Sequence, residues 1–136
     1  MVSFDVSPVA VVVAGILAMV LGFIWYGPLF GKKWMKLSGK TMKDMEAAKG
    51  KMPALYFFGF IAALITAFIL GVLISSLGVT QLGDALVVGV LVWLGFDVTL
   101  LLGGILWEGM SKELFVLNAA HQLVNLLVMS AVFVYL

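Results

Sequence analysis

The sequence predicts an all-α membrane protein with four transmembrane helices. Of its 136 residues, 64% are hydrophobic and 11% are charged, whereas a soluble domain carries about 25% charged residues. The mean hydropathy is +1.22. The apolar residues form four runs, each long enough for the ~20-residue helix that spans a bilayer. We therefore expect a single membrane domain over residues 1–136.

The first apolar run covers about residues 6–26 and ends at an aromatic boundary. Four small residues recur at every fourth position: Ala10, Ala14, Ala18 and Gly22. Such a stripe lets another helix approach closely. Trp25 and Tyr26 lie just before the first lysines, which is typical of the headgroup boundary of a membrane. Gly27 and Pro28 then predict the end of the helix.

Residues 27–52 form the first connection and hold seven of the eight lysines. Thr41-x-x-Asp44 has the pattern of a capping box, so we expect a short helix here. Met42 and Met45 would share one side of it, which predicts an amphipathic helix on the membrane surface. The lysines either belong to a solvated loop that fixes the topology or bind anionic lipid headgroups. The candidate residues for headgroup binding are Lys32, Lys33, Lys36 and Trp34.

The remaining spans are expected at about residues 53–77, 84–107 and 114–136, with a short corner at 108–113. The second span carries another stripe of small residues: Gly59, Ala63, Ala67, Gly71 and Ser75. Two such stripes predict that the first two helices pack closely, with each other or with another subunit. Asp84 is expected to cap the start of the third span.

The lysines also predict the orientation of the chain. All eight lie in the first and third connections, and the positive-inside rule places both of these connections in the cytoplasm. Both termini then lie outside. We expect a multi-pass protein of the cell (plasma) membrane, in contact with the lipid bilayer and assembled as a homo-oligomer.

Two sets of residues resemble one known membrane family. The first is the stretch Trp25-Tyr26-Gly27-Pro28-Leu29-Phe30-Gly31-Lys32-Lys33-Trp34. The second comprises Gly95-Phe96, Trp107-Glu108-Gly109 and Leu114-Phe115-x-Leu117-Asn118. Together they resemble the DUF1761 family of bacterial and archaeal membrane proteins, over essentially the whole chain. The resemblance implies a four-helix integral membrane protein with no assigned activity. The family often has a basic residue at the position of Met110.

A few polar side chains lie deep in the predicted spans and define the candidate site. At 1.5 Å per residue, Asp97 lies roughly 15 Å and His121 roughly 12 Å from the cytoplasmic boundary. Because the third and fourth helices are antiparallel, these two residues and Gln122 lie at nearly the same depth. Asn118 and Asn125 recur at helical spacing with His121. We expect these polar stripes to face one another or a water-filled cavity, because polar groups are costly against lipid.

Two interpretations of these residues remain open. In the structural one, Asp97 hydrogen-bonds to His121, Asn125 or Thr99 and holds the third and fourth helices together, at about 0.6–2 kcal/mol per bond. In the functional one, a coupled carboxyl and imidazole exchange protons near neutral pH. Glu108 is likewise either an interfacial carboxylate paired at i,i+4 with the next lysine or the cytoplasmic mouth of a polar path.

The leading functional hypothesis is an oligomeric small transporter or channel with a proton- or ion-linked site on the third and fourth helices. The alternative is a non-enzymatic membrane protein that binds a lipid or a partner, in which the polar residues are structural. A third possibility, a membrane enzyme acting on a lipidic substrate through Glu108, Asp97 and His121, has no evident nucleophile to support it.

Other chemistries find little support in the sequence. The absence of cysteine excludes disulfides, thiolate metal sites and cysteine nucleophiles. One histidine and scattered acids make a thin set of metal ligands, and the motifs of hydrolases and phosphate-binding loops are missing. The chain has no arginine and its lysines lie at a membrane boundary, so nucleic-acid binding is not expected. We therefore expect no catalytic residues, no metal and no cofactor.

Overall fold

The structure is a computed structural model that describes residues 1–136, and all of its regular elements are helical. Four helical stretches are long and apolar enough to cross a membrane: Pro8–Leu29, Lys49–Ser76, Leu82–Glu108 and Lys112–Tyr135. The shortest still exceeds the ~20 residues that a bilayer requires. The predicted all-α class with four candidate transmembrane helices is confirmed, and the chain is built as a multi-pass membrane protein.

The first stretch combines a regular helix with a π-helical turn. Helix α1 (Pro8–Ile24) continues directly into η1 (Trp25–Leu29). Pro28 lies inside η1 and has no N–H to donate to the carbonyl four residues earlier, so the regular helix cannot continue there. The aromatic pair Trp25 and Tyr26 is therefore carried on a widened turn at the end of the helix.

The first connection contains α2 (Gly31–Ser38), α3 (Met42–Ala47) and a 3-10 turn, η2 (Lys49–Lys51). The capping box of α3 forms as its sequence pattern predicts. Thr41 Oγ1 accepts a hydrogen bond from the Asp44 amide at 3.1 Å, and Asp44 Oδ2 accepts one from the Thr41 amide at 2.9 Å. The bond from the Thr41 amide holds the pKa of Asp44 below its usual value, so this cap is charged at neutral pH. Helix α2 lies where the sequence predicts a loop.

The other elements are α4 (Met52–Ser76), α5 (Leu82–Val92), the π-helical turn η3 (Trp93–Val98), α6 (Thr99–Glu108) and α7 (Lys112–Tyr135). The prediction that Asp84 caps the third span was wrong. Gln81 is the N-cap residue, and Asp84 lies in the first turn of α5, where its charge is still favourable to the helix dipole. Helix α7 begins at a Ser111 cap, whose Oγ accepts a hydrogen bond from the Leu114 amide at 3.1 Å.

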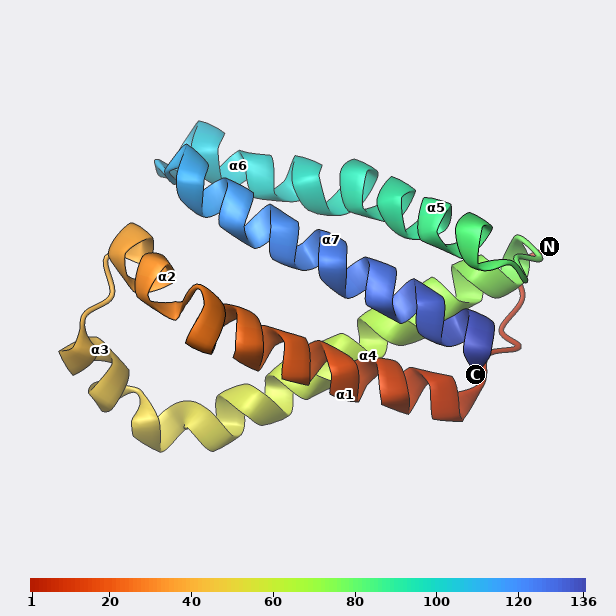
Figure 1. Cartoon of the computed structure of the whole chain (residues 1–136), viewed down its shortest axis with the longest axis horizontal. Helices are drawn as coiled ribbons and strands as arrows, with labels where there is room; N and C mark the ends of the chain where they lie inside the picture. Colours follow the sequence, from red (N-terminus) through yellow and green to blue (C-terminus); the bar gives the residue numbers. More distant parts are fainter.

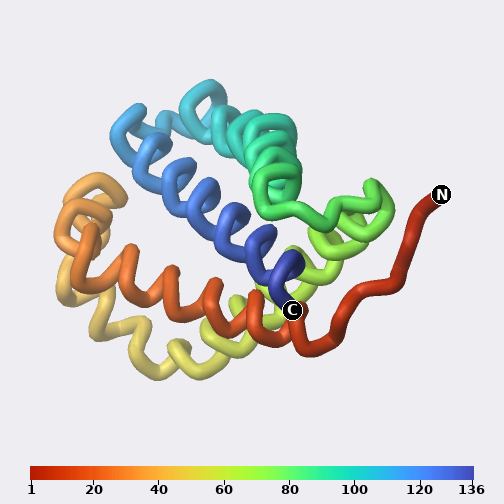
Figure 2. The backbone as a smooth tube through the Cα atoms, turned by 45° about the vertical axis from the view of Figure 1, so that its right-hand side comes forward, coloured from red at the N-terminus to blue at the C-terminus, as the bar shows by residue number.

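Helix α7 lies at the centre of the arrangement. Figure 1 shows α7 between α1 on one side and α5 and α6 on the other, with α4 crossing behind, and the turned view in Figure 2 shows the same order. Both termini lie at one end, which we call the terminal end. We call the opposite end, with α2, α3 and the corner between α6 and α7, the lysine end, because all eight lysines lie there.

The core forms where small residues allow close approach. It consists of Ala10, Ala14, Ala67, Leu70, Ile74, Ala85, Val88, Leu126, Met129 and Val132. Between α1 and α4 the approach is tightest at Gly15, where a Cβ would come within 2.8 Å of the Leu64 side chain. Helices α1 and α4 therefore pack against each other, as the two stripes of small residues predict.

Gly89 of α5 supports a testable prediction about the contact with α7. A Cβ at this position would meet Ser130 Oγ at 2.8 Å and the Leu126 carbonyl oxygen at 3.3 Å. We expect Gly89→Val to force the two helices apart and to lower the free energy of unfolding by about 1–3 kcal/mol, measured by denaturation in detergent. Gly83→Val on the same helix is the matched control, because nothing lies within 4 Å of a Cβ there. Equal losses in the two variants would contradict the prediction.

Candidate functional site

The candidate site is centred on His121 of α7, which faces the end of the first helical stretch. Its ring centroid lies 5.0 Å from that of Tyr26 and 5.8 Å from that of Trp25. Gly22, one turn earlier on α1, also faces the imidazole, since a Cβ there would lie in van der Waals contact with His121 Nε2, at 3.9 Å. The imidazole is thus enclosed by η1 and the last turn of α1.

Tyr26 links this aromatic wall to α7. Its hydroxyl donates a hydrogen bond to Asn118 Oδ1 at 2.7 Å, while its ring lies over His121. Asn118 lies one turn from His121, on the side of the lysine end. A side-chain hydrogen bond between membrane helices is worth about 0.6–2 kcal/mol. The bond therefore both fastens η1 to α7 and covers His121 from the lysine end.

Several buried polar atoms of η1 and α7 have no hydrogen-bond partner. They are His121 Nδ1, His121 Nε2, Trp25 Nε1, Asn125 Oδ1 and Ser130 Oγ. An unpaired buried polar group costs about 1–3 kcal/mol, so each one calls for an explanation. Asn118, His121 and Asn125 recur at helical spacing over roughly 10 Å of α7. We call these three residues the polar face of α7.

Asp97 is not brought onto this face. It lies half-buried in η3, and both nitrogens of His121 are unpaired, so the expected bond between them does not form. One turn earlier, Trp93 occupies the contact with α7, where its indole Nε1 donates to the Ala119 carbonyl oxygen at 2.7 Å. The π-helical turn also changes the direction of the residues that follow Trp93, compared with a regular helix. Gln122 is half-buried beside His121.

The other partners expected for the acidic residues are not found. Thr99 Oγ1 donates to the Gly95 carbonyl oxygen at 2.7 Å, within its own helix. Glu108 is exposed at the last position of α6. Gly109 then ends that helix with φ 72°, and α7 begins at Lys112. Glu108 and Lys112 therefore lie on different helices and do not form an i,i+4 pair.

The candidate headgroup residues lie on α2. Lys32, Lys33 and Lys36 are exposed there, and the half-buried ring of Trp34 meets that of Tyr26 edge-on, with centroids 6.1 Å apart. Lys33 lines a cavity of about 410 Å³ that opens between α2 and the start of α7. The structure therefore sets Lys33 apart from the other lysines of this group.

A comparison with family models finds one match, described as Protein of unknown function (DUF1761), over residues 9–134. The chain belongs to the DUF1761 family. No curated protein and no solved structure matches it. In this DUF1761 protein, the residues Trp25-Tyr26-Gly27-Pro28 that carry the resemblance form η1. They supply the aromatic wall around His121.

Trp25 and Tyr26 belong to the site, although their place just before the first lysines predicts only a membrane boundary. Tyr26 precedes Lys32 by as many residues as Asn118 follows Lys112, so their equal depth could be read from the sequence. The rotation of each helix about its axis decides which neighbour the polar face of α7 meets. The sequence predicts depth but not this rotation. Ser130 was missed because it lies on another side of α7, against Gly89.

Proposed function

We propose that this DUF1761 protein is a proton-linked transporter or channel whose path follows the polar face of α7. His121 is the group that takes up and releases the proton. One observation carries the proposal: both ring nitrogens of His121 and the side-chain oxygen of Asn125 are buried in an apolar bundle without a hydrogen-bond partner.

Polar groups that are left unpaired at this depth cost free energy, and a residue that only fills space would not need them. Histidine is also the side chain whose proton equilibrium in water lies closest to neutral pH. Asn125 follows His121 by about one helical turn, or roughly 6 Å. One or two water molecules bridge a gap of this length, and they supply the partners that the protein does not. The path therefore consists of His121, Asn125 and water between them.

The two ends of the path differ. At the lysine end, the hydrogen bond from Tyr26 to Asn118 covers His121, so this bond acts as a gate that must open for a proton to pass. At the terminal end, Asp5, Ser7 and Ser75 line a cavity of about 200 Å³. We take this cavity, because of its polar groups, as the opening of the proposed path on that side of the bundle.

The proposal includes an orientation and an assembly. The lysines place the lysine end in the cytoplasm and both termini outside the cell membrane. Only 18 of the 136 residues are buried within one chain, so most apolar side chains face lipid or another copy. We infer that the protein works as a homo-oligomer that shields the polar face of α7 from lipid.

Proton flux into proteoliposomes that hold a pH-sensitive dye tests the proposed function. We expect His121→Leu to lower the flux at least about tenfold, because removal of a proton-transfer group costs that much or more. Gln122→Leu is the matched control on the same turn, and Asp97→Asn should also keep its flux. Helix content and elution volume must match the wild type. Wild-type flux no higher than in empty liposomes, or unchanged flux in a folded His121→Leu variant, would refute the proposal.

A further inference from the structure

A second site lies outside the proposed path, in the cavity between α2 and the start of α7. The cavity measures about 410 Å³. One end is charged, with Lys33 from α2 and Lys112 and Glu113 from the first turn of α7. The remaining lining is apolar. The cavity therefore has the two-part character of a membrane lipid, a polar head joined to an apolar tail.

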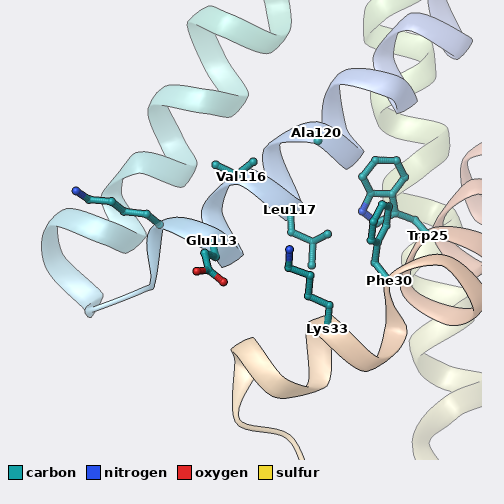
Figure 3. A pocket seen from close by; sticks show the side chains of 8 residues that line it. Trp25, Phe30, Lys33, Glu113, Val116, Leu117 and Ala120 are labelled. Carbon is teal, nitrogen blue, oxygen red and sulfur yellow. The ribbon is translucent and has the colours of Figure 1, made fainter.

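The charged end of the cavity carries both positive and negative side chains, and these side chains do not neutralise each other. Figure 3 shows the side chains of Lys33 and Glu113 directed into the space between α2 and α7, from opposite sides. No ion pair with an N–O distance of 4.0 Å or less joins them. A phosphate can thus approach the ammonium of Lys33 while a cationic group approaches the carboxylate of Glu113. Charged groups form their strongest hydrogen bonds with partners of opposite charge.

The apolar walls continue from this charged end. The rings of Trp25 and Phe30 form one wall, with centroids 4.8 Å apart. Leu117 of α7 lies across from them (Figure 3). Trp25 Nε1 is buried without a partner and is a donor of the kind that tryptophan presents at membrane interfaces. These apolar walls match the acyl chain of a lipid.

We propose that this cavity binds a zwitterionic aminophospholipid, with its phosphate on Lys33 and its primary ammonium on Glu113. An anionic headgroup without an ammonium group would pair with Lys33 and Lys112 but leave the Glu113 carboxylate without a partner. A choline headgroup has no N–H to donate to that carboxylate. The site is independent of proton transfer by His121, so it stands or falls separately from the proposed function.

Lipid retention measured by native mass spectrometry tests this site. The protein is extracted in mild detergent from liposomes of equal parts phosphatidylethanolamine, phosphatidylglycerol and phosphatidylcholine. We expect the wild type to retain phosphatidylethanolamine over the other two by roughly tenfold, which corresponds to about 1.4 kcal/mol. Glu113→Gln should lose this preference and retain phosphatidylglycerol at least as well. Lys33→Gln should retain neither phosphatidylethanolamine nor phosphatidylglycerol.

Two matched variants keep the test specific. Glu108→Gln and Lys43→Gln make the same charge changes at the lysine end, but neither residue lines the cavity. Both are expected to retain lipid like the wild type. Equal retention of the three lipids by the wild type would overturn the proposal, as would a preference for phosphatidylglycerol. Equal effects of Glu113→Gln and Glu108→Gln would overturn it as well.

Discussion

Replacement of Asn125 by leucine is expected to stabilise the protein while lowering the proposed proton flux. The Asn125 side chain is 9% exposed and its Oδ1 has no hydrogen-bond partner. Leucine has the same number and branching of side-chain heavy atoms, although it is larger, and it has no polar group to desolvate. The next residue, Leu126, already belongs to the core. We expect the free energy of unfolding to rise by about 1–2 kcal/mol, since an unpaired buried group is removed. The flux should fall at least about tenfold, because the proposed path needs Asn125 to hold the water next to His121.

The same substitution at the other end of the polar face, Asn118→Leu, provides the control. Asn118 accepts the Tyr26 hydrogen bond at 2.7 Å, so Asn118→Leu breaks a bond that Asn125→Leu does not. Denaturation in detergent should show a loss of about 1 kcal/mol for Asn118→Leu and a gain for Asn125→Leu. The two changes in the free energy of unfolding should thus have opposite signs. Such a result is expected where a residue is kept for function although it destabilises the fold. If Asn125→Leu destabilises the fold as much as Asn118→Leu, Asn125 is structural and the proposed path is wrong.

Much of the fold could be predicted because its signals are local. Apolar run length predicts the four helices, and the Thr41-x-x-Asp44 pattern predicts the cap of α3 that the structure shows. Asp84 was misplaced because a first-turn acid and an N-cap acid have the same sequence signature, and only the backbone distinguishes them. Helix α2 was missed because its lysines and the glycines at its two ends are as typical of a loop as of a short helix.

The site was harder to predict because it depends on helix rotation. Depth could be counted along the helices, and it placed Asp97 level with His121. The direction in which a side chain points around the helix axis could not be counted in the same way, since η1 and η3 both depart from the regular turn. The polar face of α7 consequently meets Tyr26 and Trp25 of η1 rather than Asp97. The side-chain bonds that join α7 to its neighbours come from Tyr26 and Trp93 instead.

Trp93 should therefore be among the most important residues for the stability of the bundle. Its indole donates to the Ala119 carbonyl oxygen at 2.7 Å, and its ring packs against the buried core. We expect Trp93→Ala to lower the free energy of unfolding by about 3–5 kcal/mol. Trp93→Phe keeps a ring and loses the donor, and should cost about 1 kcal/mol. Denaturation in detergent, followed by helix content, measures both changes.

Trp107 provides the matched control for this prediction. It lies on α6, in the same helical stretch as Trp93, but its side chain is 86% exposed. Trp107→Ala should change the free energy of unfolding by no more than about 0.5 kcal/mol. A loss in Trp93→Ala as small as that in Trp107→Ala would mean that η3 is not held to α7 by this contact. The position of Asp97 away from the polar face of α7 would then lose its physical explanation, and a direct pairing of Asp97 with His121 would again have to be considered.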